Sequence, residues 1–229
     1  FVDLQYRNVL HQLEGIDNDQ RYVELDKSFH FFNPKAGLSY DFNSKHQLYS
    51  TFAVGHREPT RSDFIDAPVG EAPKAERMYN LELGYQYASP KYAFTANYYL
   101  MNYKDQLVLT GELNDVGSPV RTNVDKSYRM GIELMGSVKP VKWFNASANV
   151  TYSINKIKNF EEVLYVYDEN YNYLGEQRIQ YENTDISFSP NLIGAVNLTF
   201  VPVKGLNVSL LGKYVGKQYL DNTQNDNRS

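Results

Sequence analysis

The stretch Phe144-Asn145-Ala146-Ser147-Ala148-Asn149-Val150-Thr151-Tyr152-Ser153-Ile154-Asn155 decides the fold. Apolar or small residues alternate with polar residues along its whole length. Successive side chains of a β-strand point to opposite faces, so this alternation predicts a strand with one apolar and one polar face. A helix of the same sequence would scatter both classes around its circumference.

The same alternation recurs in eight other segments of the chain. They cover residues 2–7, 32–41, 48–54, 79–87, 94–100, 129–138, 186–200 and 206–214. No segment shows a helical period of comparable strength. We therefore expect an all-β protein with nine antiparallel strands.

The connections between these strands are of two kinds. Short turns with Pro, Gly or Ser lie at 43–45, 88–91, 139–142 and 201–205, and long connections of about 17 to 30 residues lie at 12–28, 57–74, 104–126 and 157–185. Short and long alternate strictly, so in an up-and-down meander all short turns fall at one end of the sheet. This segregation is typical of a transmembrane β-barrel.

Composition excludes several classes of protein. The 229 residues include no cysteine, which rules out disulfides and thiolate metal sites, and the net charge of −4 shows no basic stripe for nucleic acid. No apolar run approaches the roughly 20 residues of a membrane-spanning helix, whereas barrel strands need only one apolar face.

Many of the 20 tyrosines fall near the ends of the expected strands. An amphipathic ring at such a position keeps its hydroxyl in the headgroup layer of a membrane. We therefore interpret as an interfacial girdle Tyr40, Tyr79, Tyr85, Tyr87, Tyr92, Tyr152, Tyr214 and Tyr219. The alternative is that tyrosine is simply a good strand former.

The two ends of the sequence suggest a fragment. Phe1 already stands in an alternating pattern, and the polar run Asp221 to Ser229 has no closing strand after it. We expect residues 1–229 to be a fragment of a single β-barrel domain.

Several short segments of the sequence resemble the carboxyl-terminal part of the barrel of TonB-dependent outer-membrane receptors. They are Phe32-Asn33-Pro34-Lys35-Ala36-Gly37-Leu38, Gly55-His56-Arg57-Glu58-Pro59-Thr60, Tyr79-Asn80-Leu81-Glu82-Leu83-Gly84-Tyr85, Tyr128-Arg129-Met130-Gly131-Ile132-Glu133 and Gly212-Lys213-Tyr214-Val215-Gly216-Lys217-Gln218-Tyr219. The resemblance implies a partial transmembrane β-barrel, with about 9 of roughly 22 strands present and the plug domain and final strands absent.

The resemblance also implies a function. It points to active uptake of a scarce ligand, such as an iron chelate, haem, cobalamin or a glycan, across the outer membrane of a Gram-negative cell. The implied partners are outer-membrane lipid, the plug domain of the same full-length chain, a TonB-type energy transducer, and the small-molecule or oligosaccharide ligand. Two alternatives remain: a soluble β-sandwich carbohydrate-binding module, and a passive outer-membrane porin.

Motifs for bond chemistry are missing from the sequence. It contains no His-Glu-x-x-His, no Gly-x-Ser-x-Gly and no phosphate-binding Gly-x-x-x-x-Gly-Lys pattern. Acidic pairs occur, but nothing in the sequence places two of them around a scissile bond. We expect neither an enzyme nor a cofactor or metal site.

The best candidates for ligand contact follow the third strand. Arg57 and Arg61 are suited to clamp an anionic ligand, and Glu58 and Asp63 accompany them. The alternative interpretation is that these charges pair with neighbouring strands and stiffen the rim.

Two further groups are candidates. Tyr167, Tyr171 and Tyr173 lie in a Tyr-rich long connection, where their rings are suited to stack on a sugar or planar chelate. The polar strand faces carry lumen- or plug-facing residues, which we predict to be Glu82, Arg129, Glu133 and Asn149.

Overall fold

The computed structural model describes residues 1–16, 22–67, 72–113, 117 and 119–228. Within them lie ten strands, one short α-helix and one 3-10 turn. In chain order these are β1 (Val2–Ile16), β2 (Tyr22–Asn43), β3 (His46–Arg57), α1 (Arg61–Ile65), β4 (Glu76–Ala88), β5 (Tyr92–Leu113), β6 (Pro119–Val141), β7 (Phe144–Tyr167), β8 (Tyr173–Asp185), β9 (Leu192–Val203), β10 (Leu206–Val215) and η1 (Asp226–Arg228). No helix in this part of the chain is long and apolar enough to cross a membrane.

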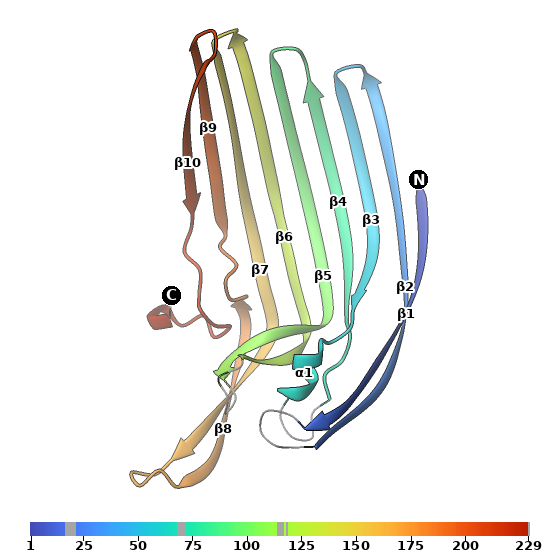
Figure 1. The fold of residues 1–229 in the computed structure, drawn as a ribbon, viewed down its shortest axis with the longest axis vertical. Helices are drawn as coiled ribbons and strands as arrows, with labels where there is room; N and C mark the ends of the chain where they lie inside the picture. Colours follow the sequence, from blue (N-terminus) through green and yellow to red (C-terminus); the bar gives the residue numbers. More distant parts are fainter. Residues whose placement is uncertain (17–21, 68–71, 114–116, 118, 229) are drawn as a thin grey trace.

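All ten strands belong to one antiparallel sheet. Each strand pairs with the next from β1 to β7, and β7 then pairs with both β8 and β9, at different heights along its length. Figure 1 shows the short turns together at one end and the longer connections at the other. The prediction of an up-and-down meander is therefore confirmed.

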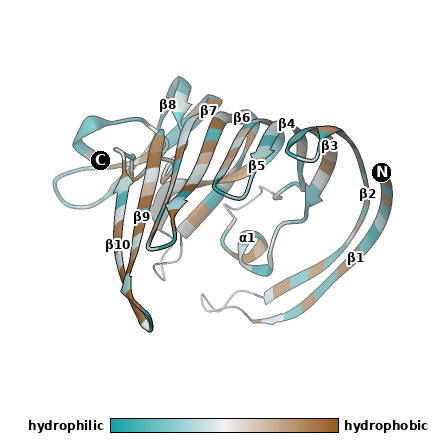
Figure 2. Cartoon of the chain, turned by 90° about the horizontal axis from the view of Figure 1, so that it is seen from above, coloured by the Kyte–Doolittle hydropathy of each residue, from teal (hydrophilic) through white to brown (hydrophobic). Residues whose placement is uncertain are grey.

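The sheet is a single curved, unclosed layer with β1 and β10 at its edges (Figure 2). A β-sandwich would bury its apolar side chains between two stacked sheets. Here the apolar side chains of the convex face are exposed instead: Leu38 is 81% and Val2 is 73% exposed. The sandwich alternative is therefore wrong for this chain.

The register separates the two faces across the whole sheet. Leu83 of β4 lies opposite Tyr98 of β5, which lies opposite Ile132 of β6, so one apolar row crosses three strands on the convex face. The neighbouring positions form the concave face, which Figure 2 shows curving around α1. A wall that is apolar outside and polar inside fits a barrel with a wet or plugged lumen.

The expected strand number and lengths are wrong. The tenth strand, β8, lies inside the long connection predicted at 157–185, and β9 begins only at Leu192 rather than at Ile186. The ladders also continue far into the predicted loops, to Ile16 opposite Tyr22, Leu113 opposite Pro119 and Tyr167 opposite Tyr173. Extending the hairpins satisfies backbone N–H and C=O groups that an irregular loop would leave to water.

A small apolar core lies at the long-connection end, where the β5/β6 hairpin crosses the β7/β8 hairpin. Its members are Val108, Val124, Ile157, Phe160 and Ile186, with Tyr181 packed against them. Ile157 and Phe160 are fully buried. The outer parts of two hairpins are thus held together by hydrophobic contact as well as by their ladders.

The predicted tyrosine positions fall mostly near the two ends of the wall. Tyr40, Tyr85, Tyr87 and Tyr92 lie within a few residues of the short turns. Tyr219 differs, because it lies beyond β10, where its hydroxyl donates to Asp226 at 3.2 Å. The interfacial girdle stays a prediction for all of these tyrosines.

Candidate functional site

The segment after β3 forms ion pairs with two neighbouring regions. Glu58 pairs with Arg7 of β1 at 2.6 Å, and the same guanidinium donates to the carbonyl oxygen of His56 at 3.1 Å. Arg57 pairs with Glu76, the first residue of β4. Glu76 is buried and also accepts the backbone N–H of Leu107 at 3.1 Å.

Helix α1 begins with a capping box. The Asp63 carboxylate accepts the Thr60 backbone N–H at 2.7 Å, while the Thr60 hydroxyl accepts the Asp63 backbone N–H. These bonds satisfy amide groups that the first helical turn leaves without partners. Asp63 is 7% exposed and pairs with Arg121 of β6 at 3.2 Å.

The other side of α1 packs against the β1/β2 hairpin. The Phe64 ring lies 6.5 Å from the Phe29 ring and 6.1 Å from the His11 ring, measured between centroids. Because Asp63 binds the β5/β6 hairpin, α1 connects two hairpins across the concave side of the sheet (Figure 2).

These contacts place three of the four charged candidates in ion pairs. Arg57, Glu58 and Asp63 each bind an opposite charge on another element, which is the geometry of the rim-stiffening alternative. Arg61 differs: its side chain is exposed, and no ion pair joins it to another residue in the described part of the chain. Arg61 is thus the one charged candidate without an ion pair among the described residues.

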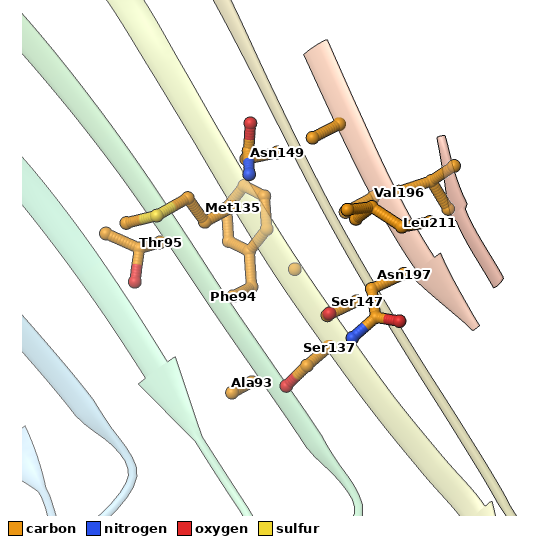
Figure 3. Close-up of a pocket in the computed structure, with 13 residues that line it drawn as sticks. Ala93, Phe94, Thr95, Met135, Ser137, Ser147, Asn149, Val196, Asn197 and Leu211 are labelled. Carbon is orange, nitrogen blue, oxygen red and sulfur yellow. The ribbon is translucent and has the colours of Figure 1, made fainter. Parts of the chain in front are cut away.

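A polar pocket of about 440 Å³ lies on the concave face. Glu82, Arg129 and Glu133 line it, so the structure brings together three of the four residues predicted on the polar faces. Asn149 is on the same face but borders a different pocket, of about 310 Å³, which spans β5 to β10 (Figure 3).

The two carboxylates of the 440 Å³ pocket are held by amides rather than cations. Glu82 accepts from Asn80 at 2.8 Å, and Glu133 accepts from Asn97 at 3.3 Å. Arg129 donates to the hydroxyl of Ser189 at 2.9 Å. Within the described residues neither glutamate has an ion-pair partner, so the pocket retains capacity for a cationic group.

Two glycines make room for tyrosine rings on this wall. A Cβ at Gly84 would lie inside the Tyr49 ring, and a Cβ at Gly131 would lie 2.7 Å from the Tyr99 hydroxyl oxygen. Each tyrosine therefore lies across a glycine of the next strand. Glycine in a strand interior often marks such a close approach.

The tyrosine candidates gather at the apex of the β7/β8 hairpin. The ring of Tyr173 lies 5.9 Å from that of Tyr167, whereas Tyr171 is 88% exposed. Asp168 organises the turn by accepting from the side chain of Asn172, and this hydrogen bond, with further backbone N–H donors, lowers the pKa of the Asp168 carboxyl.

The structure does not join this apex to the charged candidates after β3. In Figures 1 and 2 the tip of the β7/β8 hairpin and α1 lie apart. Nor do the described residues gather three or more His, Cys, Asp or Glu side chains that could hold a metal ion.

The sequence did not indicate the structural role of Asn222. Asn222, beyond β10, is fully buried; its side-chain oxygen accepts the Ser187 N–H at 2.8 Å and its amide donates to the Leu109 carbonyl. It therefore ties the segment after β10 to β5 and to the segment before β9. The polar run that contains it gave no signal of burial.

The family comparison identifies the barrel. A family model described as TonB dependent receptor-like, beta-barrel matches residues 11–229. A search of curated proteins found no match.

Solved structures share the fold. The ferric yersiniabactin uptake receptor FyuA from Yersinia pestis matches with a TM-score of 0.66 and 15% identity, over 97% of this chain and 32% of that one. The ferric-catecholate import receptor Fiu from E. coli K12 gives 0.62 and 16% over 95% and 31%, and the copper transporter OprC gives 0.62 and 18% over 83% and 27%.

The chain thus spans about a third of the length of these structures. At such identities the likeness concerns the fold, and it agrees with the match to the β-barrel family model. The chain belongs to the TonB-dependent receptors, proteins of the Gram-negative outer membrane, and forms part of their β-barrel.

Proposed function

We propose that this chain is a wall segment of a receptor that takes up a scarce ligand by active transport, driven by a TonB-type transducer of the inner membrane. The observation that carries the proposal is the two-faced wall, apolar on its convex side and polar on its concave side, within a family-matched barrel. The ligand class is that of the similar solved structures, which are importers of ferric chelates and copper.

Ligand contact is proposed at the long-connection end. Arg61 supplies a guanidinium without an ion-pair partner among the described residues, suited to a carboxylate or other anionic group of a chelate. Tyr171, together with Tyr167 and Tyr173, supplies aromatic faces at the outer tip of the β7/β8 hairpin. Arg57, Glu58 and Asp63 would support this region by holding α1 and its flanks in place.

The concave pocket is proposed to face the plug domain of the full-length chain. Glu82 and Glu133 offer two carboxylates to basic side chains, and Arg129 offers a cation to acidic ones. Asn149, farther along the same face, offers a neutral amide. A plug held by such charge-assisted hydrogen bonds can be released without breaking an apolar core.

Uptake measurements with the full-length receptor test this function. Cells that lack their other ferric-chelate receptors would be given radioactive iron bound to hydroxamate, catecholate or carboxylate chelators. We expect saturable uptake of at least one chelate, falling to background in a matched strain without the transducer. A ligand-independent control is the uptake of a small sugar through the resident porins, which should be equal in both strains.

The porin alternative predicts a different result. Uptake that rises linearly with concentration and persists without the transducer would describe passive diffusion, and would contradict active transport. Saturable uptake that disappears without the transducer would exclude the porin.

A further inference from the structure

The short-turn edge of the sheet carries a row of lysines. Residues 43–46, 88–92, 139–143 and 203–206 contain none of the 27 acidic residues of the chain. The basic side chains there are Lys45, Lys91, Lys139, Lys142 and Lys204. All five are exposed, and none forms an ion pair with a described residue.

Backbone hydrogen bonds place these turns side by side. The N–H of Ala88 donates to the carbonyl of Lys45 at 2.9 Å, and the N–H of Lys139 donates to the carbonyl of Lys91 at 2.8 Å. Val201 then donates to Trp143 at 2.8 Å, which joins the last turn to the others. The lysines therefore follow one continuous edge, the end with short turns in Figure 1.

Aromatic rings lie directly beside this edge. Ring centroids are 5.0 Å apart for Tyr40 and Phe42, 4.9 Å for His46 and Tyr87, and 5.1 Å for Phe144 and Phe200. Trp143, the single tryptophan of the chain, is 55% exposed. Such rings favour the boundary between hydrocarbon and headgroups, so the lysines beyond them stand at headgroup level.

An apolar groove of about 550 Å³ opens on the convex face next to the same edge. Its walls include Leu38, Tyr40, Tyr85 and Ile132, and the small side chains of Ser50 and Ala96 leave it hollow. Leu48 is three residues from Lys45 in the sequence, which is roughly 10 Å along a strand.

We propose that this edge binds an anionic glycerophospholipid of the leaflet on the short-turn side, with its phosphate at the lysine row and one acyl chain in the groove. Charge complementarity supports the phosphate, because lysines near a membrane surface attract anionic lipids. Continuity with the lipid-facing surface supports the acyl chain, since the groove is part of the exposed apolar band. The inference rests on the membrane placement of the wall and is independent of ligand uptake.

Lipid exchange on the full-length receptor tests the proposal. The measurement is the exchange constant of phosphatidylglycerol against phosphatidylcholine with identical chains, in vesicles that hold the wild type or the combined Lys45→Gln, Lys91→Gln and Lys139→Gln variant. Each lysine near an anionic surface contributes about fivefold, so we expect the preference for phosphatidylglycerol to fall about a hundredfold. The matched control replaces Lys104, Lys126 and Lys158, toward the other end, with glutamine and should keep the preference.

Two further measurements separate headgroup from chain. Raising the salt concentration should weaken the preference of the wild type for phosphatidylglycerol. This measurement uses the wild type alone, so it does not depend on the folding of a variant. Ser50→Leu fills the groove and should reduce the fraction of lipid held at the receptor, measured for each lipid alone, by the same factor for both, while leaving the preference intact. The proposal is overturned if the lysine variant keeps the wild-type preference, if the control loses as much, or if Ser50→Leu binds both lipids like the wild type.

Discussion

Val150→Arg is expected to lower the free energy of unfolding of the full-length receptor in lipid by about 2 to 4 kcal/mol. Val150 lies on the convex face of β7, opposite Leu134 of β6 and Gly194 of β9. At about 3.3 Å per residue and a tilt of about 40°, it lies roughly 15 Å below Phe144 in depth, near the middle of the hydrocarbon layer. A guanidinium there loses its hydration, which is the source of the cost.

Two matched variants make the test of Val150 specific. Phe144→Arg adds the same charge to the same face at the first residue of β7, where the short turn meets the headgroups, and should cost about 0 to 1 kcal/mol. Asn149→Arg places the charge on the concave polar face and should also cost less than Val150→Arg. Urea unfolding in phospholipid vesicles measures all three, and an equal or inverted ranking would show that the two faces are assigned wrongly.

Asn222→Leu is expected to destabilise the long-connection end by about 2 to 6 kcal/mol. The substitution keeps the approximate volume but leaves the Ser187 N–H and the Leu109 carbonyl without their partner. A buried polar group left unsatisfied costs about 1 to 3 kcal/mol, and here there are two. The β5/β6 hairpin and the segment before β9 should open together, because both bind the same side chain.

Amide hydrogen exchange on these segments measures the effect of Asn222→Leu. Protection around Leu109 and Ser187 should fall, while protection in the middle of β4 and β5 should stay unchanged. Asn225→Leu is the control, since Asn225 is exposed and its side chain accepts the nearby Asn227 N–H at 2.9 Å. Equal exchange in the two variants would show that Asn222 does not anchor the hairpin.

The sequence predicted the membrane-spanning part of the fold well. Strict alternation, as in residues 144–155, is visible because one face meets lipid and the other meets water or polar groups. Pro, Gly and Ser marked all four short turns, since those residues favour tight turns. The meander and the two faces followed from these two signals.

The outer hairpins could not be predicted in the same way. Beyond the membrane both faces of a strand can be polar, so β8 carries Glu, Gln, Arg and Asn with little alternation and its sequence predicts a loop. The buried positions there are set by contact between hairpins: Val108 and Phe160 belong to one core because two long ladders cross. Such contacts between distant segments leave no periodic pattern.

The candidate site residues fall into the same two groups: some positions follow from the strand pattern, and others depend on contacts between distant segments. The positions of Glu82, Arg129 and Glu133 on one face follow from strand parity, which the sequence shows directly. The ion pairs of Arg57, Glu58 and Asp63 depend on how three hairpins and α1 meet, so the sequence left ligand contact and rim stiffening open. Asn222 could not be found at all, because a buried asparagine and an exposed one look alike in a polar run.

Single-cysteine scanning along β7 tests most directly the claim that this sheet is a membrane wall. The chain has no cysteine, so Ala148→Cys, Asn149→Cys, Val150→Cys and Thr151→Cys can each be labelled with a fluorophore in the full-length receptor freed of other cysteines. Quenchers carried on lipid chains should dim the labels at 148 and 150, and water-soluble quenchers should dim those at 149 and 151 or leave them shielded by the plug. Equal lipid quenching at all four positions, or none at 148 and 150, would contradict the account.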